Sequence, residues 1–181
     1  NLSFLFNIVM DLGINNYTTK NIAQYPHIVS RYINKIFSFR LILFALYAIV
    51  TLAIGIGIGY EGDQLYLLLI LIFNQWMVMF IAYFRSHFGG LHLFKTDAII
   101  SVLDRLLLIL LCGSVLFFTS AGQHFQIEWF IWMQTACYSI TLLVAFILLV
   151  KQIGVPSFSF NWTFSLAILR KSYPYALLIL F

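Results

Sequence analysis

The chain has 181 residues, of which 62% are hydrophobic and only 9% are charged, and its mean hydropathy is +0.98. A typical soluble domain carries about 25% charged residues, so this composition excludes an ordinary soluble protein and indicates an integral membrane chain. The net charge of +4 comes from basic residues scattered along the sequence. They form no dense basic patch, so we expect no nucleic-acid partner; the expected surrounding is the lipid bilayer.

Apolar runs close to the roughly 20 residues needed to cross a bilayer recur along the chain. Backbone in lipid must satisfy its own hydrogen bonds, so these runs are expected to be helices. The sequence therefore predicts an all-α, multi-spanning helical bundle. The first and last of about six spans are incomplete, and we expect the sequence to be a piece of a larger membrane protein. The expected spans cover residues 2–14, 41–60, 65–84, 98–119, 129–150 and 174–181.

Two polar connectors interrupt this series. Residues 15–40 carry apolar side chains at roughly helical spacing with a break at Pro26, which predicts two short amphipathic pieces at the membrane surface. In the second connector, residues 151–173, polar and apolar residues alternate from Ser157 to Phe164. An isolated strand is not viable in lipid, so we interpret this segment as interfacial, with a short helix starting at Leu166.

The loops fall into two sets of opposite charge. One set contains three acids, Glu61, Asp63 and Glu128, and neither lysine nor arginine. By the positive-inside rule, the other set is predicted to face the cytoplasm. That set carries Lys20, Arg31, Lys35, Arg40, Arg85, Lys95, Lys151, Arg170 and Lys171.

Asp97 to Gly113 is the one span-forming segment that carries a cation together with acids. At helical spacing Asp97 shares a face with Ser101 and with Asp104 or Arg105. Arg105 lies about two helical turns beyond Asp97, roughly 12 Å, which places it in the cytoplasmic half of its span. Two interpretations remain open: the group faces a cavity and binds a ligand, or the acids merely neutralise Arg105 at a helix end.

Other polar residues carry weaker predictions. The amides of Asn74 and Gln75, at mid-depth in the span 65–84, favour interhelical hydrogen bonds over substrate contacts. His87 and His92 lie in an expected short, basic, glycine-broken loop and lack a third ligand, which favours surface histidines over a metal site. Asp11 has the same two interpretations as the acids near Arg105, and for it we favour a simple helix-end acid.

Several short motifs follow one another in a set order. In this order, with these loop lengths and this topology, they resemble the polysaccharide (O-antigen) flippase family of the multidrug/oligosaccharidyl-lipid/polysaccharide exporter superfamily. The resemblance runs from the second into the seventh helix of a protein with twelve to fourteen, so the chain is expected to hold most of one MATE-like lobe and not to transport alone. The motifs are Met10–Ile14, Thr19–Ala23, Phe84-Arg85, Gly89–Leu91, Phe94-Lys95, Ser101–Arg105, Phe160–Trp162 and Leu169–Pro174.

The resemblance implies a function. Two lobes of such a protein enclose a cationic cavity and alternate access, moving a lipid-linked oligosaccharide out across the bacterial cytoplasmic (inner) membrane for lipopolysaccharide or other surface polysaccharide. Arg105 would attract the pyrophosphate of an undecaprenyl-pyrophosphate-linked oligosaccharide, with Arg85 or Lys95 at the entrance. Asp104 and Asp97 would restrain Arg105 or couple to a cation, H⁺ or Na⁺.

Two other function classes remain as alternatives. A drug/cation antiporter of the same superfamily would have buried acids and few cavity cations, whereas the charge within the spans is balanced here. A membrane glycosyltransferase or acyltransferase needs a catalytic acid or histidine in a sizeable loop, and the short outward loops offer only His124 and Glu128. The sequence therefore predicts no catalytic, cofactor or metal site; Asn7, like the amides of residues 74 and 75, is a weak candidate for sugar contact.

Overall fold

The computed structural model describes residues 11, 13–25, 27, 29–118, 127–155 and 161–180, with the backbone alone at 30, 31, 116–118 and 176–180. The described residues form helices and no strand, which confirms the predicted all-α class. The expected first span, residues 2–14, lies mostly outside the described residues, as do Asn7 and His124. The helices are α3 (Ile14–Gln24), α4 (Val29–Gly57), α5 (Asp63–Gly90), α6 (Phe94–Phe118), α7 (Ile127–Ile153) and α8 (Trp162–Leu180).

Four of these helices are long and apolar enough to cross a membrane. At 1.5 Å per residue, the 28 residues of α5 span about 42 Å, more than the roughly 30 Å hydrocarbon core of a bilayer. The chain is therefore a multi-pass membrane protein. The candidate spans are Tyr32–Gly57, Asp63–Gly90, Phe94–Val115 and Ile127–Ile153.

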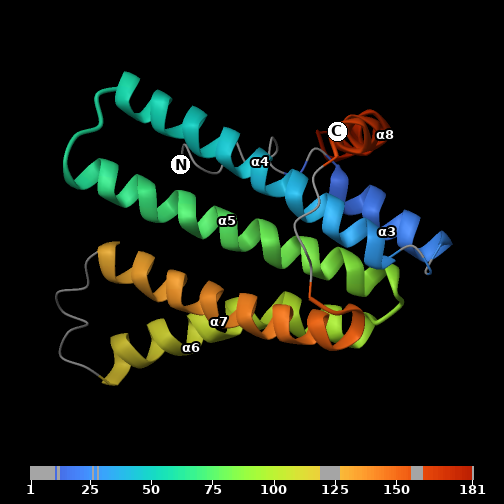
Figure 1. The fold of residues 1–181 in the computed structure, drawn as a ribbon. Helices are drawn as coiled ribbons and strands as arrows, with labels where there is room; N and C mark the ends of the chain where they lie inside the picture. The colour runs from blue at the N-terminus through green and yellow to red at the C-terminus, as the bar shows by residue number, and fades with distance from the viewer. Residues whose placement is uncertain are drawn as a thin grey trace.

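Helix α5 is the centre of the bundle, because it packs against α3, α4, α6 and α7. The chain reverses direction from each long helix to the next, so α4 to α7 lie side by side and alternate in direction (Figure 1). The acidic turn around Glu61 and the start of α7 at Glu128 share one end of the bundle, and the connections after α3, α5 and α7 share the other. The acidic loops and the basic connections therefore lie at opposite ends of the bundle, as the loop charges predicted.

The end of α5 differs from the prediction. Arg85 to Gly90 were expected in a glycine-broken loop, but they continue the helix, and the connection to α6 is only Leu91–Leu93. Gly90 is needed for helix packing, since a Cβ added there would lie 2.7 Å from the Cβ of Ile22 on α3. The helix ends in a Schellman-type turn, in which Leu93 N–H donates to the Phe88 carbonyl at 2.8 Å and His92 has a φ of 59°.

The first connector forms the two predicted helical pieces, as α3 and the first turns of α4, and apolar residues of both pack into the bundle. Ile22 of α3 and Ile33 and Ile36 of α4 are buried, and α3 packs directly on α5. The second piece is continuous with the spanning part of α4, because nothing between Val29 and Gly57 interrupts the helix.

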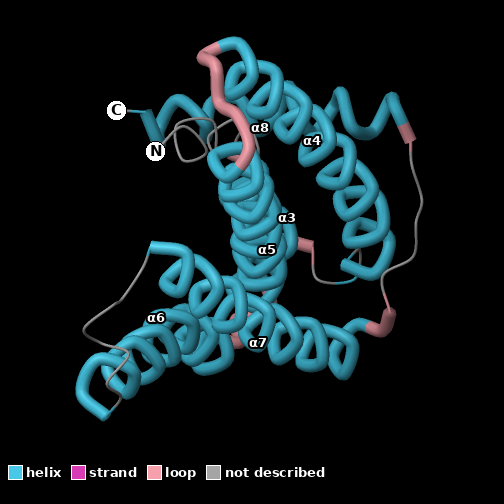
Figure 2. The backbone as a smooth tube through the Cα atoms, turned by 90° about the vertical axis from the view of Figure 1, so that its left-hand side faces the viewer, coloured by secondary structure: helices cyan, strands magenta, loops and turns pink. Residues whose placement is uncertain are grey.

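The second connector ends in one continuous helix, α8. A short helix from Leu166 and a separate span at Pro174 were expected, but α8 begins at Trp162 and runs through Pro174. Asn161 caps its start, because its Oδ1 accepts a hydrogen bond from Phe164 N–H at 3.1 Å. Residues 156–160 lie outside the described part, so the structure describes only the helical end of the alternating segment. Figure 2 shows α8 lengthwise, whereas Figure 1 shows it end-on beside the lengthwise α4 to α7.

Candidate functional site

A small charged pocket lies between α5 and α6, in the half of the bundle that carries the basic connections. Its volume is about 160 Å³, and it is lined by apolar side chains together with the polar groups of Arg85, Ser101, Asp104 and Arg105. Three predicted site residues, two guanidinium groups and one carboxylate, therefore line one pocket. Guanidinium groups are suited to bind a phosphate-bearing ligand.

An ion pair between the ends of the two helices borders this pocket. Arg85 Nε lies 2.7 Å from Asp97 Oδ1, and the two side chains are 37% and 29% exposed. The short connection between α5 and α6 causes this contact, because it places the last turn of one helix beside the first turn of the next. Partly exposed pairs of this kind contribute about 0–1 kcal/mol to stability, so this pair is a weak constraint.

Arg105 is the cation that this arrangement leaves available. The sequence suggested that Asp97 or Asp104 restrains it, but Asp97 pairs with Arg85 instead. Arg105 is an exposed residue, and the structure shows no ion pair to it among the described residues. Counting from the start of α6 at Phe94, it lies 11 residues along the helix, about 16 Å by helical rise.

The other predicted site residues lie outside the pocket lining. Lys95 is exposed in the first turn of α6. Asn74 is 1% exposed, and both of its amide atoms lack a hydrogen-bond partner among the described residues, as does Oε1 of Gln75. Asn74 lies 11 residues before Arg85, and this helical spacing places both residues on the same side of α5. Asn74 is therefore on the side of α5 that lines the pocket, about 16 Å deeper in the bundle.

An apolar groove lies between α4, α5 and α7. Its volume is about 280 Å³, and aromatic and leucine side chains line it. A groove of this lining suits a hydrocarbon chain and disfavours a sugar, because hydroxyl groups would lose their hydrogen bonds there. Its lining residues are Phe37, Trp76, Phe80, Phe84, Leu142, Leu143 and Phe146.

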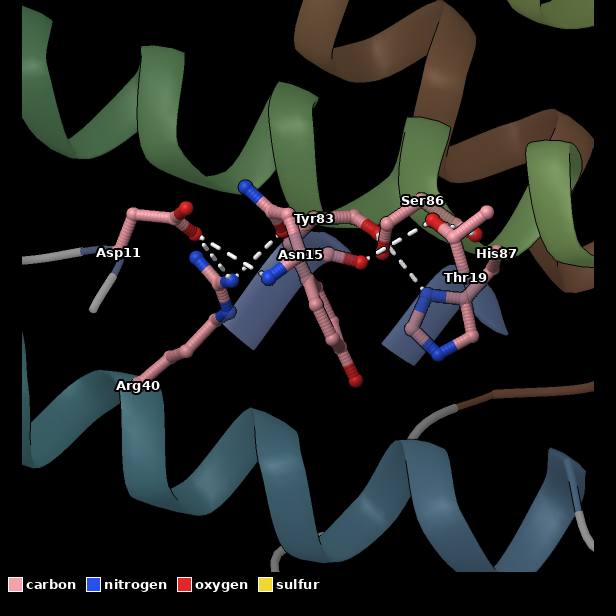
Figure 3. Close-up of polar contacts among 7 residues, drawn as sticks. All are labelled: Asp11, Asn15, Thr19, Arg40, Tyr83, Ser86 and His87. Atoms are coloured by element: carbon pink, nitrogen blue, oxygen red, sulfur yellow. Dashed lines mark hydrogen bonds and ion pairs between the residues drawn. The ribbon is translucent and has the colours of Figure 1, made fainter. Parts of the chain in front are cut away.

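A second cluster of polar residues is buried between α3, α4 and α5, around Arg40 (Figure 3). Arg40 Nη2 lies 3.1 Å from Asp11 Oδ1 and 2.6 Å from Asn15 Oδ1, and its guanidinium carbon lies 5.1 Å from the ring centre of Tyr83. The Arg40 side chain is 0% exposed, whereas Asp11 is 27% exposed. The prediction that Arg40 is a loop cation is wrong, because Arg40 lies within α4 and forms a largely buried ion pair with Asp11.

His87 extends this cluster along α5. It is fully buried, so its interpretation as a surface histidine is also wrong; His92 is exposed as expected. His87 Nδ1 donates to the Tyr83 carbonyl at 2.8 Å, and the Tyr83 hydroxyl donates to the Ile33 carbonyl of α4 at 2.6 Å. Nε2 of His87, like Nε and Nη1 of Arg40, has no hydrogen-bond partner among the described residues.

The sequence contained a signal for this cluster. Along α4 the buried residues recur at helical spacing on both sides of Arg40, at Ile33, Ile36, Leu43 and Tyr47. A cation at that register shares a face with core residues and needs a buried acceptor. The spacing of these apolar residues around Arg40 is the sequence signal that was missed.

The described residues include no group of three or more histidine, cysteine or acidic residues placed to hold a metal ion. The charged pocket between α5 and α6 combines guanidinium groups with a carboxylate, and the buried cluster uses its polar groups to join three helices. Both arrangements fit a membrane protein of the transporter type.

Comparisons with known proteins place the chain in a family. No curated protein and no solved structure matches it. A family model described as "Polysaccharide biosynthesis protein" matches residues 1–181, the whole sequence. The chain is therefore a multi-pass membrane protein that belongs to the polysaccharide biosynthesis protein family.

Proposed function

We propose that the chain is part of a flippase that moves lipid-linked oligosaccharides across the bacterial cytoplasmic membrane for surface polysaccharide synthesis. The observation that carries this proposal is the family match over residues 1–181 in a chain with four candidate spans. The pocket between α5 and α6 adds support, because it places two arginines within a membrane bundle. Cations at such positions are costly in lipid and are retained where they bind an anion or line a pathway.

In this proposal Arg105 binds the pyrophosphate of an undecaprenyl-pyrophosphate-linked oligosaccharide. It lies at the pocket, is exposed, and has no ion pair among the described residues. Arg85 stands nearer the end of the bundle, paired with Asp97, and Lys95 is exposed close by. These cations attract the headgroup to the pocket entrance, and the carboxylate of Asp104 limits how tightly the pocket retains it or couples to H⁺ or Na⁺.

The apolar groove between α4, α5 and α7 suits the other part of such a substrate. A polyprenyl chain has no hydrogen-bonding groups, so aromatic and leucine walls contact it at no polar cost. The charged pocket and this groove lie on two different packing seams of α5. In this proposal the charged head of the substrate contacts the pocket and its apolar tail contacts the groove.

The test is complementation with the full-length protein in a bacterial strain that lacks its own flippase. Arg105→Ala should abolish surface polysaccharide while the lipid-linked oligosaccharide still accumulates, because transport fails and synthesis does not. Arg105→Lys should retain part of the activity, since it keeps the charge but loses the bidentate geometry. Lys151→Ala is the matched control, because it removes an exposed cation from the same end of the bundle.

Three results would overturn the proposal. Normal surface polysaccharide in Arg105→Ala would remove the anion-binding role of this residue. Absence of the lipid-linked oligosaccharide in cells without the protein would point to an enzyme that synthesises it. A wild-type protein that protects cells from cationic drugs but restores no polysaccharide would point to a drug/cation antiporter. Membrane insertion of each variant is checked by fractionation.

A further inference from the structure

Helix α8 differs from the other long helices in orientation. Helices α4 to α7 run along the bundle, whereas α8 lies across it, at the end where the basic connections gather (Figures 1 and 2). It is also absent from the four candidate spans of the described residues. If the long helices cross the bilayer, α8 therefore lies along the membrane surface.

One face of α8 is attached to the bundle. Phe164 lies edge-on to Tyr32 at 5.0 Å between ring centres, with Lys35 Nζ 4.7 Å from the Phe164 ring centre. Near the other end, Lys20 Nζ lies 3.0 Å from the Tyr175 hydroxyl, and this hydrogen bond raises the pKa of Lys20 above its ordinary value. These contacts to α3 and α4 fix which side of α8 remains free.

The free side of α8 carries apolar residues and a basic one. Trp162, Leu166 and Tyr173 are 64%, 54% and 62% exposed, and their spacing places them in one stripe along the helix. Arg170, four residues after Leu166, is exposed beside this stripe, whereas Lys171, seven residues after Phe164, is exposed at the edge of the attached face. Aromatic residues next to basic ones are typical of helices that lie at the boundary between lipid headgroups and acyl chains.

This end of the bundle has a surplus of positive charge. Its carboxylates Asp11 and Asp97 are each paired with an arginine of the bundle. Lys20 and Lys35, which contact α8, add to its two cations, and no ion pair to any of these four appears among the described residues. The surface around α8 therefore complements a negatively charged layer.

We propose that α8 is a binding site for anionic phospholipids, with Arg170 contacting their headgroups and the Trp162–Leu166–Tyr173 stripe entering the acyl boundary. A basic residue near an anionic surface strengthens binding roughly fivefold, so Arg170 gives a preference of about fivefold over zwitterionic lipid. The proposal requires that α4 to α7 cross the bilayer, but it does not require that the protein transports a particular substrate.

The test measures lipid selectivity at α8 in the full-length protein reconstituted into nanodiscs of phosphatidylcholine with 30% phosphatidylglycerol. A fluorophore is attached to Thr163→Cys in a cysteine-free background, because Thr163 is exposed and lies seven residues before Arg170 on the same face. Quenching is compared between headgroup spin-labelled phosphatidylglycerol and headgroup spin-labelled phosphatidylcholine. The anionic lipid should quench several-fold more strongly.

The variants decide between specific binding and simple proximity. Arg170→Gln should remove the preference for the anionic lipid and leave quenching by phosphatidylcholine unchanged. Lys151→Gln, at the end of α7, should leave the preference intact. Equal quenching by both lipids, no quenching by either, or a preference that survives Arg170→Gln would each overturn the proposal. None of these readouts involves transport, so failure here and failure of the flippase assignment are distinguishable.

Discussion

Two regions of the bundle contain the same pair of groups, an arginine and an aspartate, in different surroundings. Arg40 is fully buried against Asp11, whereas Arg85 and Asp97 are each about a third exposed. A buried cation left without its partner is costly, because no water replaces the lost acceptor, whereas a partly exposed pair is readily hydrated. The same chemistry therefore joins helices in the first region and leaves charges available for a ligand in the second.

The largest expected effect tests the buried region. Asp11→Ala leaves the Arg40 cation buried, so the free energy of unfolding should fall by about 3–5 kcal/mol, near the lower end because Asp11 is 27% exposed. The measurement is unfolding of the detergent-solubilised protein by sodium dodecyl sulfate. Asp11→Ala combined with Arg40→Met should recover much of the loss, because it removes the uncompensated charge. A double variant as unstable as the single one would contradict this account.

The second prediction concerns the packing that encloses the buried region. Gly90→Ala places a methyl group 2.7 Å from Ile22 Cβ and should destabilise the protein by about 1–3 kcal/mol, because α3 must move away from α5. Gly89→Ala is the matched control in the neighbouring position. Its Cβ meets only Thr19 Cγ2 at 3.5 Å, so it should be neutral or stabilising. Equal effects of the two substitutions would show that helix propensity decides here and close packing does not.

The third prediction concerns Arg105 in the charged pocket between α5 and α6. Arg105→Ala should leave the unfolding free energy within about 0.5 kcal/mol of wild type, because this side chain is exposed. Its effect should appear in affinity for a pyrophosphate-bearing lipid, which should fall about tenfold or more with the loss of charge-assisted hydrogen bonds. Binding of polyprenyl pyrophosphate to the full-length protein measures this, and a stability loss without an affinity loss would reverse the assignment of the two regions.

The smallest expected effect is at the exposed ion pair. Asp97→Ala should lower the unfolding free energy by no more than about 1 kcal/mol, because Arg85 is 37% exposed and keeps contact with solvent. The comparison with Asp11→Ala is direct, since both remove the carboxylate partner of an arginine. If Asp97→Ala lowered the free energy of unfolding as much as Asp11→Ala, solvent exposure would not explain the difference between the two ion pairs.

Sequence reasoning succeeded where one helix at a time was sufficient. Long apolar runs predicted the helices α4 to α7, and the separation of basic from acidic loops matches the two ends of the bundle. The spacing of Ser101, Asp104 and Arg105 along one segment also anticipated residues that now line one pocket. In each case a periodicity or a length within a single segment contained the answer.

The sequence did not predict burial or ion-pair partners that depend on which helix packs against which. Charge alone suggested a loop position for Arg40 and a surface position for His87, but α3 covers both by packing closely on α5 at Gly90. The partner of Asp97 is on α5 and not on its own helix.

What the sequence by itself determined is that this chain forms apolar, membrane-spanning helices with their cations gathered toward one end. Only the tertiary structure decided which cations are buried and which remain available. Hydrophobic length and periodicity are properties of one segment, whereas the burial of a charge and the choice of its partner depend on the register between packed helices.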